Sequence, residues 1–507
     1  MKKILFVFAF VFAFVFVYSC KPDNRPGEVH GTVSYHDRDI PDIEVKYSGD
    51  NGTYTYTTNS SGYYVIRDIP AGDYTVSVSY KGQAVRSYLL NYEKSENPNL
   101  ATIAVNGYHV RNIIIPADEV IDWEEPDDDE DEDEDDYSLP EAEIPILAWY
   151  SIPASFATAE RFEELKDCGF TLSFSHTSTL DEAITTLDCA EQAGIKVIVP
   201  CPEANTEAFV EAVKDKPALY GYFLRDEPKT NELEALGTWA DRILAKDSEH
   251  AIYFNLFPNY ASDEVLGSTY EEYVKQSVQK VKSTQVSFDF YPIRETSIVN
   301  SWWENLEIVK KYSQEANLPF WAFALSTSHN PYPIPEKSHL RLQMYMNLAY
   351  GAQCLQYFTY WCPTPGTWDF HDAPIAEDGT RTAVYDLVQE MNEELQARAG
   401  VFMGCKVNGV YQTGDHQPNG TYPLTGYNPP LSKLSINDGE ATVSFLENGK
   451  WAYMMMVNRN HLQGFTYSIS FEKDVQIVNR NGSIEDMGNT AETALEAGDC
   501  VIFRWKK

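Results

Sequence analysis

Basic residues are scarce in this sequence. It contains 39 lysines and arginines against 76 aspartates and glutamates, a formal net charge of −37 over 507 residues. A chain this acidic repels phosphate groups. We therefore expect neither nucleic acid nor an anionic membrane surface as a partner. Much of the charge is local, because residues 127–136 are all acidic. Such a run repels itself, and we interpret it as a solvated, extended linker.

The sequence also has few motifs built on cysteine or glycine. The eight cysteines are widely spaced, and the seven that follow Cys20 are an odd number lying mostly in apolar segments. This pattern argues against a disulfide framework, and no pair has the close spacing of a zinc site. No glycine-rich dinucleotide fingerprint follows the first strand of the central region. We therefore expect no metal and no cofactor.

The N-terminus predicts export from the cytoplasm. Residues 1–19 combine a basic pair, a dense apolar run and a final serine, which is typical of a secretory signal and too short for a spanning helix. Residues 17–20 (VYSC) resemble a bacterial lipobox, which implies lipidation of Cys20 and a tether over residues 20–26. We expect a protein secreted across the inner membrane and lipid-anchored at the outer membrane or cell surface. An ordinary cleaved signal with a free Cys20 thiol is the alternative.

Residues 27–118 predict a small β-sandwich, because short runs of alternating apolar and polar residues are separated by turn signals. Residues 62–64 (GYY) and 69–74 (IPAGDY) resemble the carboxypeptidase regulatory-like domain of many Bacteroidetes surface proteins. The resemblance implies a platform without chemistry of its own. Residues 119–141 form the acidic linker that follows it.

Residues 142–400 predict a (β/α)8 TIM barrel. Eight strand-like runs alternate with amphipathic segments of helical spacing over about 250 residues, which is the count of that fold. The predicted strands are residues 144–153, 170–176, 195–202, 219–228, 251–259, 285–293, 319–329 and 355–361. Residues 401–507 return to alternating patterns and predict a C-terminal β-sandwich. The whole chain is thus multidomain, with a β-sandwich on each side of a barrel.

Acidic residues end two of the predicted barrel strands. Asp226 and Glu227 close strand four, and Asp289 closes strand six. The carboxyl ends of the strands form the active-site face of a TIM barrel. Because neighbouring residues on a strand point to different sides, one acid of the pair can face the pocket while the other supports it.

Aromatic and polar residues occupy the other strand ends. Rings that stack on sugar C–H faces, beside groups that pair with hydroxyls, suit a carbohydrate substrate. The candidate substrate-binding residues are Trp149, His176, Asn255, Tyr291, Trp321, Tyr360 and Trp361. Each also has a structural alternative, either as a core aromatic or as a satisfied polar group near the rim.

Glycoside cleavage needs a proton donor for the leaving oxygen and a second group that stabilises the oxocarbenium centre. With Glu227 closing strand four, residues 219–228 resemble clan A glycoside hydrolase barrels, such as the family 42 β-galactosidases. Residues 340–361 resemble the penultimate helix and last strand of Bacteroidetes barrels that are labelled glycosidase-like. The first resemblance implies Glu227 as the general acid. Two departures stand out. Asp226 occupies the place of the usual asparagine, and residues 319–330 contain no carboxylate where the strand-seven nucleophile is expected.

Two hypotheses accommodate these departures. Asp289 could act as nucleophile or base. Alternatively, the Asp226–Glu227 pair resembles that of the family 20 and 123 N-acetylhexosaminidases, which implies that the substrate's acetamido group attacks while Asp226 orients it, with Tyr291 as a possible hydrogen-bond donor.

We therefore predict a glycoside hydrolase that cleaves a β-glycosidic bond in an oligo- or polysaccharide, β-galactosidase-like or β-N-acetylhexosaminidase-like. A catalytically inactive, surface glycan-binding lipoprotein with the same barrel is the second hypothesis. The separation of Glu227 from a partner acid distinguishes the two, since either glycosidase geometry requires two carboxyl groups about 5–10 Å apart.

Overall fold

The protein folds into two compact units, one ending at Ile121 and one beginning at Asp122, in a computed structural model. The structure describes residues 26–36, 38–58, 62–90, 97–103, 108–121, 123, 137–426 and 428–507. The predicted signal segment, Cys20 and the acidic run therefore lie outside the described residues. Within the described ranges, no helix is both long and apolar enough to cross a membrane.

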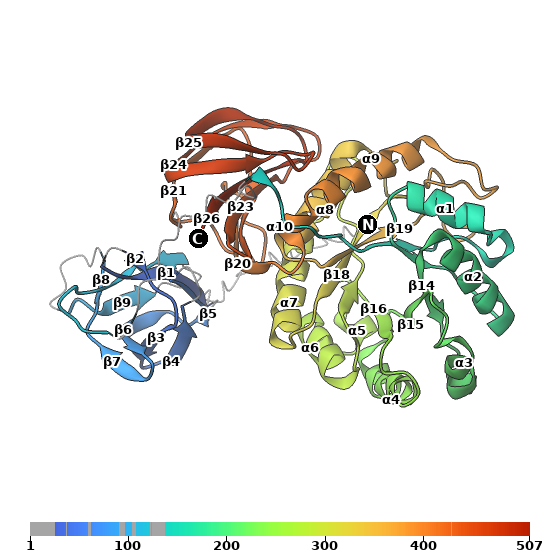
Figure 1. Ribbon diagram of the computed structural model, residues 1–507, viewed down its shortest axis with the longest axis horizontal. Helices are drawn as coiled ribbons and strands as arrows, with labels where there is room; N and C mark the ends of the chain where they lie inside the picture. Colours follow the sequence, from blue (N-terminus) through green and yellow to red (C-terminus); the bar gives the residue numbers. More distant parts are fainter. Residues whose placement is uncertain are drawn as a thin grey trace, which may run out of the picture. The chain divides into compact units, whose positions relative to one another are not determined.

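The N-terminal unit consists of two sheets that share one core (Figure 1). The first sheet contains β1 (Gly27–Tyr35), β2 (Arg38–Asp39), β5 (Tyr63–Ile69), β8 (Tyr88–Leu89), β10 (Tyr108–Val110) and β11 (Ile113–Ile115). The second contains β3 (Ile43–Gly49), β4 (Gly52–Thr57), β6 (Gly72–Tyr80), β7 (Gln83–Val85) and β9 (Leu100–Ile103). Tyr47 and Tyr64 join the sheets through their buried hydroxyl groups, 2.9 Å apart. The predicted sandwich is confirmed.

Eight parallel strands close into the predicted barrel (Figure 1). They are β12 (Ile146–Trp149), β13 (Leu172–Phe174), β14 (Lys196–Pro200), β15 (Leu219–Asp226), β16 (Ala251–Leu256), β17 (Val286–Phe288), β18 (Phe320–Leu325) and β19 (Cys354–Phe358). Each lies within or next to its predicted range and is shorter, because the residues past its end turn into the loops of the active-site face.

Helices follow the strands and cover the outside of the barrel. They are α1 (Ala159–Asp167), α2 (Leu180–Ala193), α3 (Thr206–Val213), α4 (Leu233–Leu244), α5 (Asp263–Leu266), α6 (Tyr270–Lys280), α7 (Ser301–Glu315), α8 (Lys337–Ala349), α9 (Ala383–Ala397) and α10 (Ala399–Phe402). Local sequence sets their ends. For example, Thr179 and Glu182 form a capping box at the start of α2, and Gly194 ends that helix with a φ of 74°.

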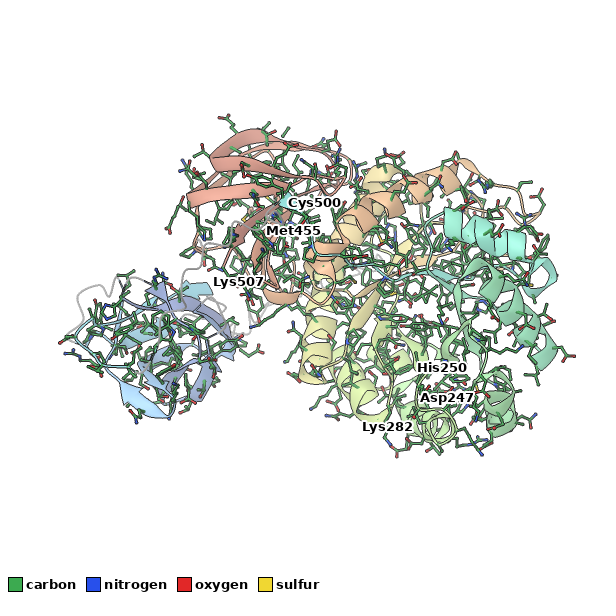
Figure 2. All side chains as sticks on the ribbon, in the orientation of Figure 1. Asp247, His250, Lys282, Met455, Cys500 and Lys507 are labelled. Atoms are coloured by element: carbon green, nitrogen blue, oxygen red, sulfur yellow. The ribbon has the colours of Figure 1, made fainter. Side chains whose placement is uncertain are left out.

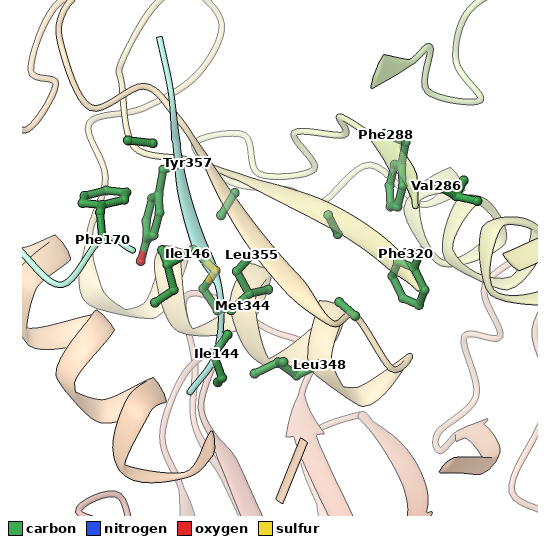
Figure 3. Close-up of a cluster of buried hydrophobic side chains, with 14 of the residues drawn as sticks. Ile144, Ile146, Phe170, Val286, Phe288, Phe320, Met344, Leu348, Leu355 and Tyr357 are labelled. Carbon is green, nitrogen blue, oxygen red and sulfur yellow. The ribbon is translucent and has the colours of Figure 1, made fainter. Parts of the chain in front are cut away.

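Helix α8 is buried along most of its length, from His339 to Ala349. On one side, Met344 and Leu348 lie in a cluster with Ile146 of β12 and Leu355 of β19, all fully buried (Figure 3). On the other side, α8 contacts strands of the C-terminal region. A helix with apolar residues on both sides explains why the barrel and the C-terminal region form one compact unit.

The C-terminal strands form one continuous antiparallel sheet in the order β20-β22-β23-β26-β24-β21, with β25 paired to β24. Their bounds are β20 (Lys406–Gln412), β21 (Leu431–Asn437), β22 (Ala441–Asn448), β23 (Trp451–Asn458), β24 (Phe465–Val478), β25 (Ile484–Leu495) and β26 (Cys500–Lys506). Between the neighbouring strands β24 and β26, the ring of Phe471 packs 5.2 Å from that of Phe503. Met455 and Cys500 are buried within it (Figure 2).

The seven described cysteines are all unpaired, and five of them are buried. They contribute to the core as small apolar side chains, as the spacing predicts. Burial raises the pKa of thiols such as Cys168 and Cys500 well above the usual range, which keeps them protonated and unreactive.

Candidate active site

A backbone irregularity at the end of β15 positions the acidic pair. Phe223 pairs with Tyr253 and Asp226 pairs with Asn255, so one extra residue bulges out of β15 between these two contacts. Glu227 follows in the left-handed conformation, with a φ of 47°, which non-glycine residues rarely adopt. Its N–H donates to the carbonyl oxygen of Asn255 at 2.9 Å. The bulge and turn bring both acids to the mouth of the barrel.

The side chain of Asn255 connects strands four and six. Its Nδ2 donates to Oδ1 of Asp289 at 2.7 Å and to Oδ1 of Asp226 at 3.3 Å. Because both oxygens contact one nitrogen, they lie at most about 6 Å apart. The Oδ1 atom of Asn255 accepts a hydrogen bond from Ser287 at 2.9 Å, which fixes the orientation of the amide.

A buried chain of hydrogen bonds holds Ser287 in turn. Nε2 of Gln356 donates to the Ser287 hydroxyl at 2.9 Å, and the hydroxyl of Tyr253 donates to Oε1 of Gln356 at 2.7 Å. All three side chains are buried in the barrel interior. The barrel core therefore sets the direction in which Asn255 presents its N–H groups.

Among the described residues, no lysine, arginine or histidine forms a salt bridge with any of the three carboxyl groups. The natural candidate, Arg225, pairs instead with Glu232 at 2.7 Å and leaves its neighbour Asp226 unpaired by charge. None of the salt bridges within the described ranges includes Asp226, Glu227 or Asp289. Three uncompensated acids at close range are costly to ionise together, which is a property of functional sites.

The carboxyl groups consequently bind their protons more tightly. Burial raises the pKa of Asp226 to about 6, although the hydrogen bond from Asn255 opposes the rise. Burial and the charge of Asp226 raise the pKa of Glu227 to about 7. Burial and the charges of Glu227 and Asp226 raise the pKa of Asp289 well above its usual value. Near neutral pH, Asp226 is the carboxyl group that ionises most readily and Glu227 still carries a proton in part.

Water reaches these groups although protein atoms surround them. The side chain of Asp226 is exposed, and those of Glu227 and Asp289 are half-buried. The three acids thus combine pKa values raised by burial with side-chain surface that solvent reaches, and we call the space in front of them the recess. A substrate can therefore approach the acids directly.

Aromatic rings surround the recess. Tyr291, two residues after Asp289, lies 5.9 Å from Tyr332 and 5.6 Å from Phe358 between ring centres. Tyr260 is half exposed, and after burial the charge of Asp289 is the main cause that raises its pKa. Tyr260, Tyr332 and Phe358 were not predicted from the sequence. The first two lie in loops beyond the strands, and their nearby prolines were the only signal.

Two predicted residues of the first two strands meet at the rim. The ring of Trp149 lies 5.1 Å from that of His176, and Phe174 lies 4.3 Å from His176. The His176 side chain keeps contact with solvent, but burial among neighbouring side chains lowers its pKa to about 4, because it removes water that would stabilise the cation. A neutral imidazole above an indole can contact a sugar without carrying charge.

Three predicted substrate-binding residues lie elsewhere. Trp321 is buried inside the barrel, where its ring packs against Tyr220 at 5.9 Å, close to where β15 begins. Tyr360 is fully buried against Phe170, and Trp361 packs against Phe156. The structure places these three side chains in core packing, because strand-end position alone does not tell which side of the barrel wall a side chain faces. Their role in substrate binding stays a prediction.

The missing carboxylate of strand seven is a feature of the structure as well. β18 ends at buried Leu325, and the chain continues through buried Ser326 and Thr327. Ser326 donates to the carbonyl oxygen of Thr359 at 2.7 Å, and the hydroxyl groups of Thr327 and Thr359 lie 2.6 Å apart. These contacts anchor the end of β18 to the end of β19 rather than serving chemistry.

The described residues contain no cluster of histidine, cysteine, aspartate and glutamate side chains that could hold a metal ion. A cavity of about 760 Å³ does lie away from the acids, between the loop that precedes α7 and the C-terminal sheet. Trp303, Arg459 and Asp438 are among its lining residues. We place the candidate active site at the acids, since their chemistry and not cavity size carries the assignment.

The fold and site define a class of protein, a (β/α)8 barrel with interacting carboxyl groups at the carboxyl ends of its strands. Two family profiles match the chain. The carboxypeptidase regulatory-like domain matches residues 28–105, and the β-galactosidase profile of glycoside hydrolase family 42 matches residues 265–398. The resemblances to these two families that were stated from the sequence are confirmed. The second match contains Asp289 and begins after Glu227.

Solved structures of glycoside hydrolases share similarity with the chain at low identity. A family 39 glycoside hydrolase from Bacteroides cellulosilyticus is 12% identical with a TM-score of 0.46, over 91% of this chain and 94% of the other. A β-galactosidase from Bacillus circulans sp. alkalophilus is 10% identical with a TM-score of 0.49, over 71% and 99%. No curated protein sequence matches the chain.

Proposed function

We propose that this protein is a glycoside hydrolase that cleaves a β-glycosidic bond in an oligo- or polysaccharide, with Glu227 as the general acid. The observation that carries the proposal is the environment of Glu227. Burial and the neighbouring Asp226 raise its pKa to about 7, so it still carries a proton in part near neutral pH. A general acid is most effective when its pKa lies near the working pH.

The second group must counter the positive charge that develops on the sugar ring. Asp226 is the ionised candidate at neutral pH, and Asn255 fixes one of its oxygens. Asp289 is the other candidate, held by the same amide at 2.7 Å. Its raised pKa means that it becomes a nucleophile or base only when it has lost a proton to a neighbour.

Two routes follow from these assignments. In the first, Asp289 attacks the sugar or activates water while Glu227 protonates the leaving oxygen. In the second, an acetamido group of the substrate attacks. Asp226 orients that group and stabilises the positive charge that develops on it, so no carboxylate of strand seven is needed. The end of β18, which offers Leu325 and hydroxyl residues only, favours the second route.

The test is hydrolysis of aryl β-galactosides, β-glucosides and β-N-acetylhexosaminides by the native protein and by Glu227→Gln, with Glu234→Gln as control. Glu234 is an exposed acid on α4 and lies outside the recess. Turnover that is lost in Glu227→Gln and kept in Glu234→Gln supports the proposal. Equal turnover in all three proteins overturns the role of Glu227.

Two further variants separate the routes. Asp226→Asn should abolish activity, and Asp289→Asn should spare most of it, if the acetamido group is the nucleophile. If Asp289→Asn abolishes activity, Asp226→Asn spares most of it, and substrates without an acetamido group are turned over, Asp289 is the nucleophile or base. The amide of Asn255 can still donate to either asparagine oxygen, so both variants preserve the local hydrogen bond.

A second candidate function is glycan binding without cleavage. It is favoured by one observation, the lack of a carboxylate at the end of β18. No turnover of the aryl panel or of natural glycans, together with measurable glycan affinity, would select this function. The recess and its rings serve binding in either case.

We also propose that the protein is anchored through a lipidated Cys20 and displayed at the outer membrane or cell surface. The VYSC sequence at residues 17–20 supports this. Metabolic labelling with a fatty acid should mark the native protein and leave Cys20→Ser unlabelled and soluble after cell fractionation. Labelling that persists in the variant would contradict the anchor.

A further inference from the structure

The loop between β19 and α9 exposes a large aromatic side chain at the active-site face. Trp368 is 52% exposed, although tryptophan is usually well buried. Tyr260, after β16, and Ile334, after β18, are each 50% exposed as well. Because all three lie on loops that follow barrel strands, they share the face that carries the acids.

A succession of rings leads from the acids to Trp368. Tyr291 follows Asp289 by two residues and lies 5.9 Å from Tyr332. The ring of His329 lies 4.6 Å from Tyr332 and 5.8 Å from Trp368. Two ring-to-ring steps therefore separate Trp368 from Tyr332 at the recess.

Contacts with the neighbouring loop hold this segment in place. The backbones of Ser328 and His371 exchange two hydrogen bonds, of 2.9 and 3.0 Å. The carboxylate of Asp369 accepts from the N–H of Asn330 at 2.8 Å. These anchors lie on both sides of His329 and directly beside Trp368, so the exposed indole is presented from a fixed backbone and not from a free loop.

We propose that Trp368 is a platform for a sugar ring outside the cleavage site, so that the preferred substrate is an oligosaccharide or polysaccharide chain. This inference rests on the proposed glycosidase function and adds the length of the substrate to it. An exposed indole at a fixed position offers the apolar surface on which the C–H face of a sugar stacks. The carboxylate of Asp369 follows Trp368 directly in the chain, so this surface fits an uncharged glycan better than an acidic one.

The test compares short and long substrates in one protein. We expect Trp368→Ala to lower kcat/KM for oligosaccharides of three to six units by about tenfold or more, since truncated tryptophans at binding surfaces cost that much. The value for an aryl monoglycoside with the same terminal sugar should stay within about twofold. Trp368→Tyr, which keeps a ring, should recover most of the loss.

Ile334→Ala is the matched control, because Ile334 is equally exposed on the adjacent loop but has no ring. It should leave both substrates unchanged. An equal loss for short and long substrates in Trp368→Ala, or no loss for either, would overturn the platform.

A binding measurement distinguishes failure of the proposed hydrolysis from failure of the Trp368 platform. Calorimetric titration of native protein and Trp368→Ala with cello-, galacto- and chito-oligosaccharides of one to six units requires no turnover. Affinity that rises with chain length in the native protein and loses that rise in Trp368→Ala supports the platform on an inactive barrel. Absence of any length dependence in the native protein rejects it.

Discussion

One amide organises the site at the scale of single residues. Asn255 donates to Asp226 and to Asp289, and its own orientation depends on the hydrogen bond that it accepts from Ser287. The carboxylates are therefore positioned from inside the barrel, by side chains that a substrate does not touch. Three predictions belong to this scale.

The pH dependence of kcat/KM should report the ionisation of Glu227. Because its pKa is raised to about 7, the acid form is present below that pH and is lost above it. We expect kcat/KM to fall tenfold per unit as pH rises beyond about 7. In Glu227→Gln this limb should vanish and the rate should fall by roughly 10²–10⁴-fold. A limb that is unchanged in Glu227→Gln would assign the proton to another group.

The raised pKa values of the site's carboxyl groups should also lower the free energy of unfolding at high pH. A carboxyl group whose pKa is higher in the folded than in the unfolded chain stabilises the fold at low pH, and this contribution is lost as pH rises through the folded pKa. The free energy of unfolding should therefore decrease between about pH 4 and pH 7. Glu227→Gln should be more stable than the native protein at pH 8, by roughly 1–3 kcal/mol after allowance for solvent screening, and similar to it at pH 4.

Denaturant unfolding at the two pH values measures this difference. Glu234→Gln, on the exposed face of α4, should show no such dependence. If Glu227→Gln were the less stable protein at pH 8, the acids would be stabilising charges and the assignment of raised pKa values would be wrong.

Ser287 is predicted to act as a positioning residue. Ser287→Ala removes the donor to Oδ1 of Asn255, so the amide is free to turn away from the acids. We expect kcat/KM to fall roughly tenfold. Since the hydrogen bond from Asn255 lowers the pKa of Asp226, the acidic limb of the pH profile should move to higher pH. Ser287→Thr should restore both, whereas a purely structural role would alter stability and leave the profile in place.

At the scale of elements, periodicity predicted the barrel well. All eight strands are found at their expected places, because each is a short apolar run between amphipathic helices. The C-terminal sheet was predicted less completely. The alternating runs at residues 441–449, 450–459, 466–473, 475–480 and 500–507 predict five strands. They do not include β20, β21 or β25, and the third and fourth runs merge into β24. β25 has few apolar residues and is mostly exposed, so only its hydrogen bonds to β24 make it a strand.

Helix α8 suggests a prediction about the junction of barrel and C-terminal sheet. Arg341 of α8 is buried and pairs with Glu394 of α9 at 2.6 Å. Removal of one partner leaves the other charge buried without compensation. Arg341→Met should therefore lower the free energy of unfolding by about 3–5 kcal/mol. The exposed pair Lys337–Glu390 on the same two helices is the control, and Lys337→Met should cost less than about 1 kcal/mol.

Denaturant unfolding measures both variants. If Arg341→Met and Lys337→Met lowered the free energy of unfolding by similar amounts, burial would not determine the contribution of the Arg341–Glu394 pair. The double variant Arg341→Met with Glu394→Gln should recover part of the loss, because no uncompensated charge then remains.

At the scale of the whole molecule, the barrel and the C-terminal sheet form one unit and the N-terminal sandwich another. A fragment of residues 137–507 should fold alone, with a melting temperature and activity close to those of the full chain. A fragment of residues 137–404 should not, because it uncovers buried side chains of α8 that contact the C-terminal sheet. Thermal melts and solubility of the two fragments test this, and a stable barrel without the C-terminal sheet would contradict it.

Sequence alone determined the order of domains, the eight barrel strands and the two acidic strand ends, because apolar periodicity and strand-end position are local properties of the chain. Only the tertiary structure decided which side chains reach the recess. Trp321, Tyr360 and Trp361 are buried in core packing, while Tyr260 and Tyr332 lie near the acids on loops. The direction of a side chain past a strand end depends on bulges, backbone turns and neighbouring loops, and these are set by packing between segments far apart in sequence.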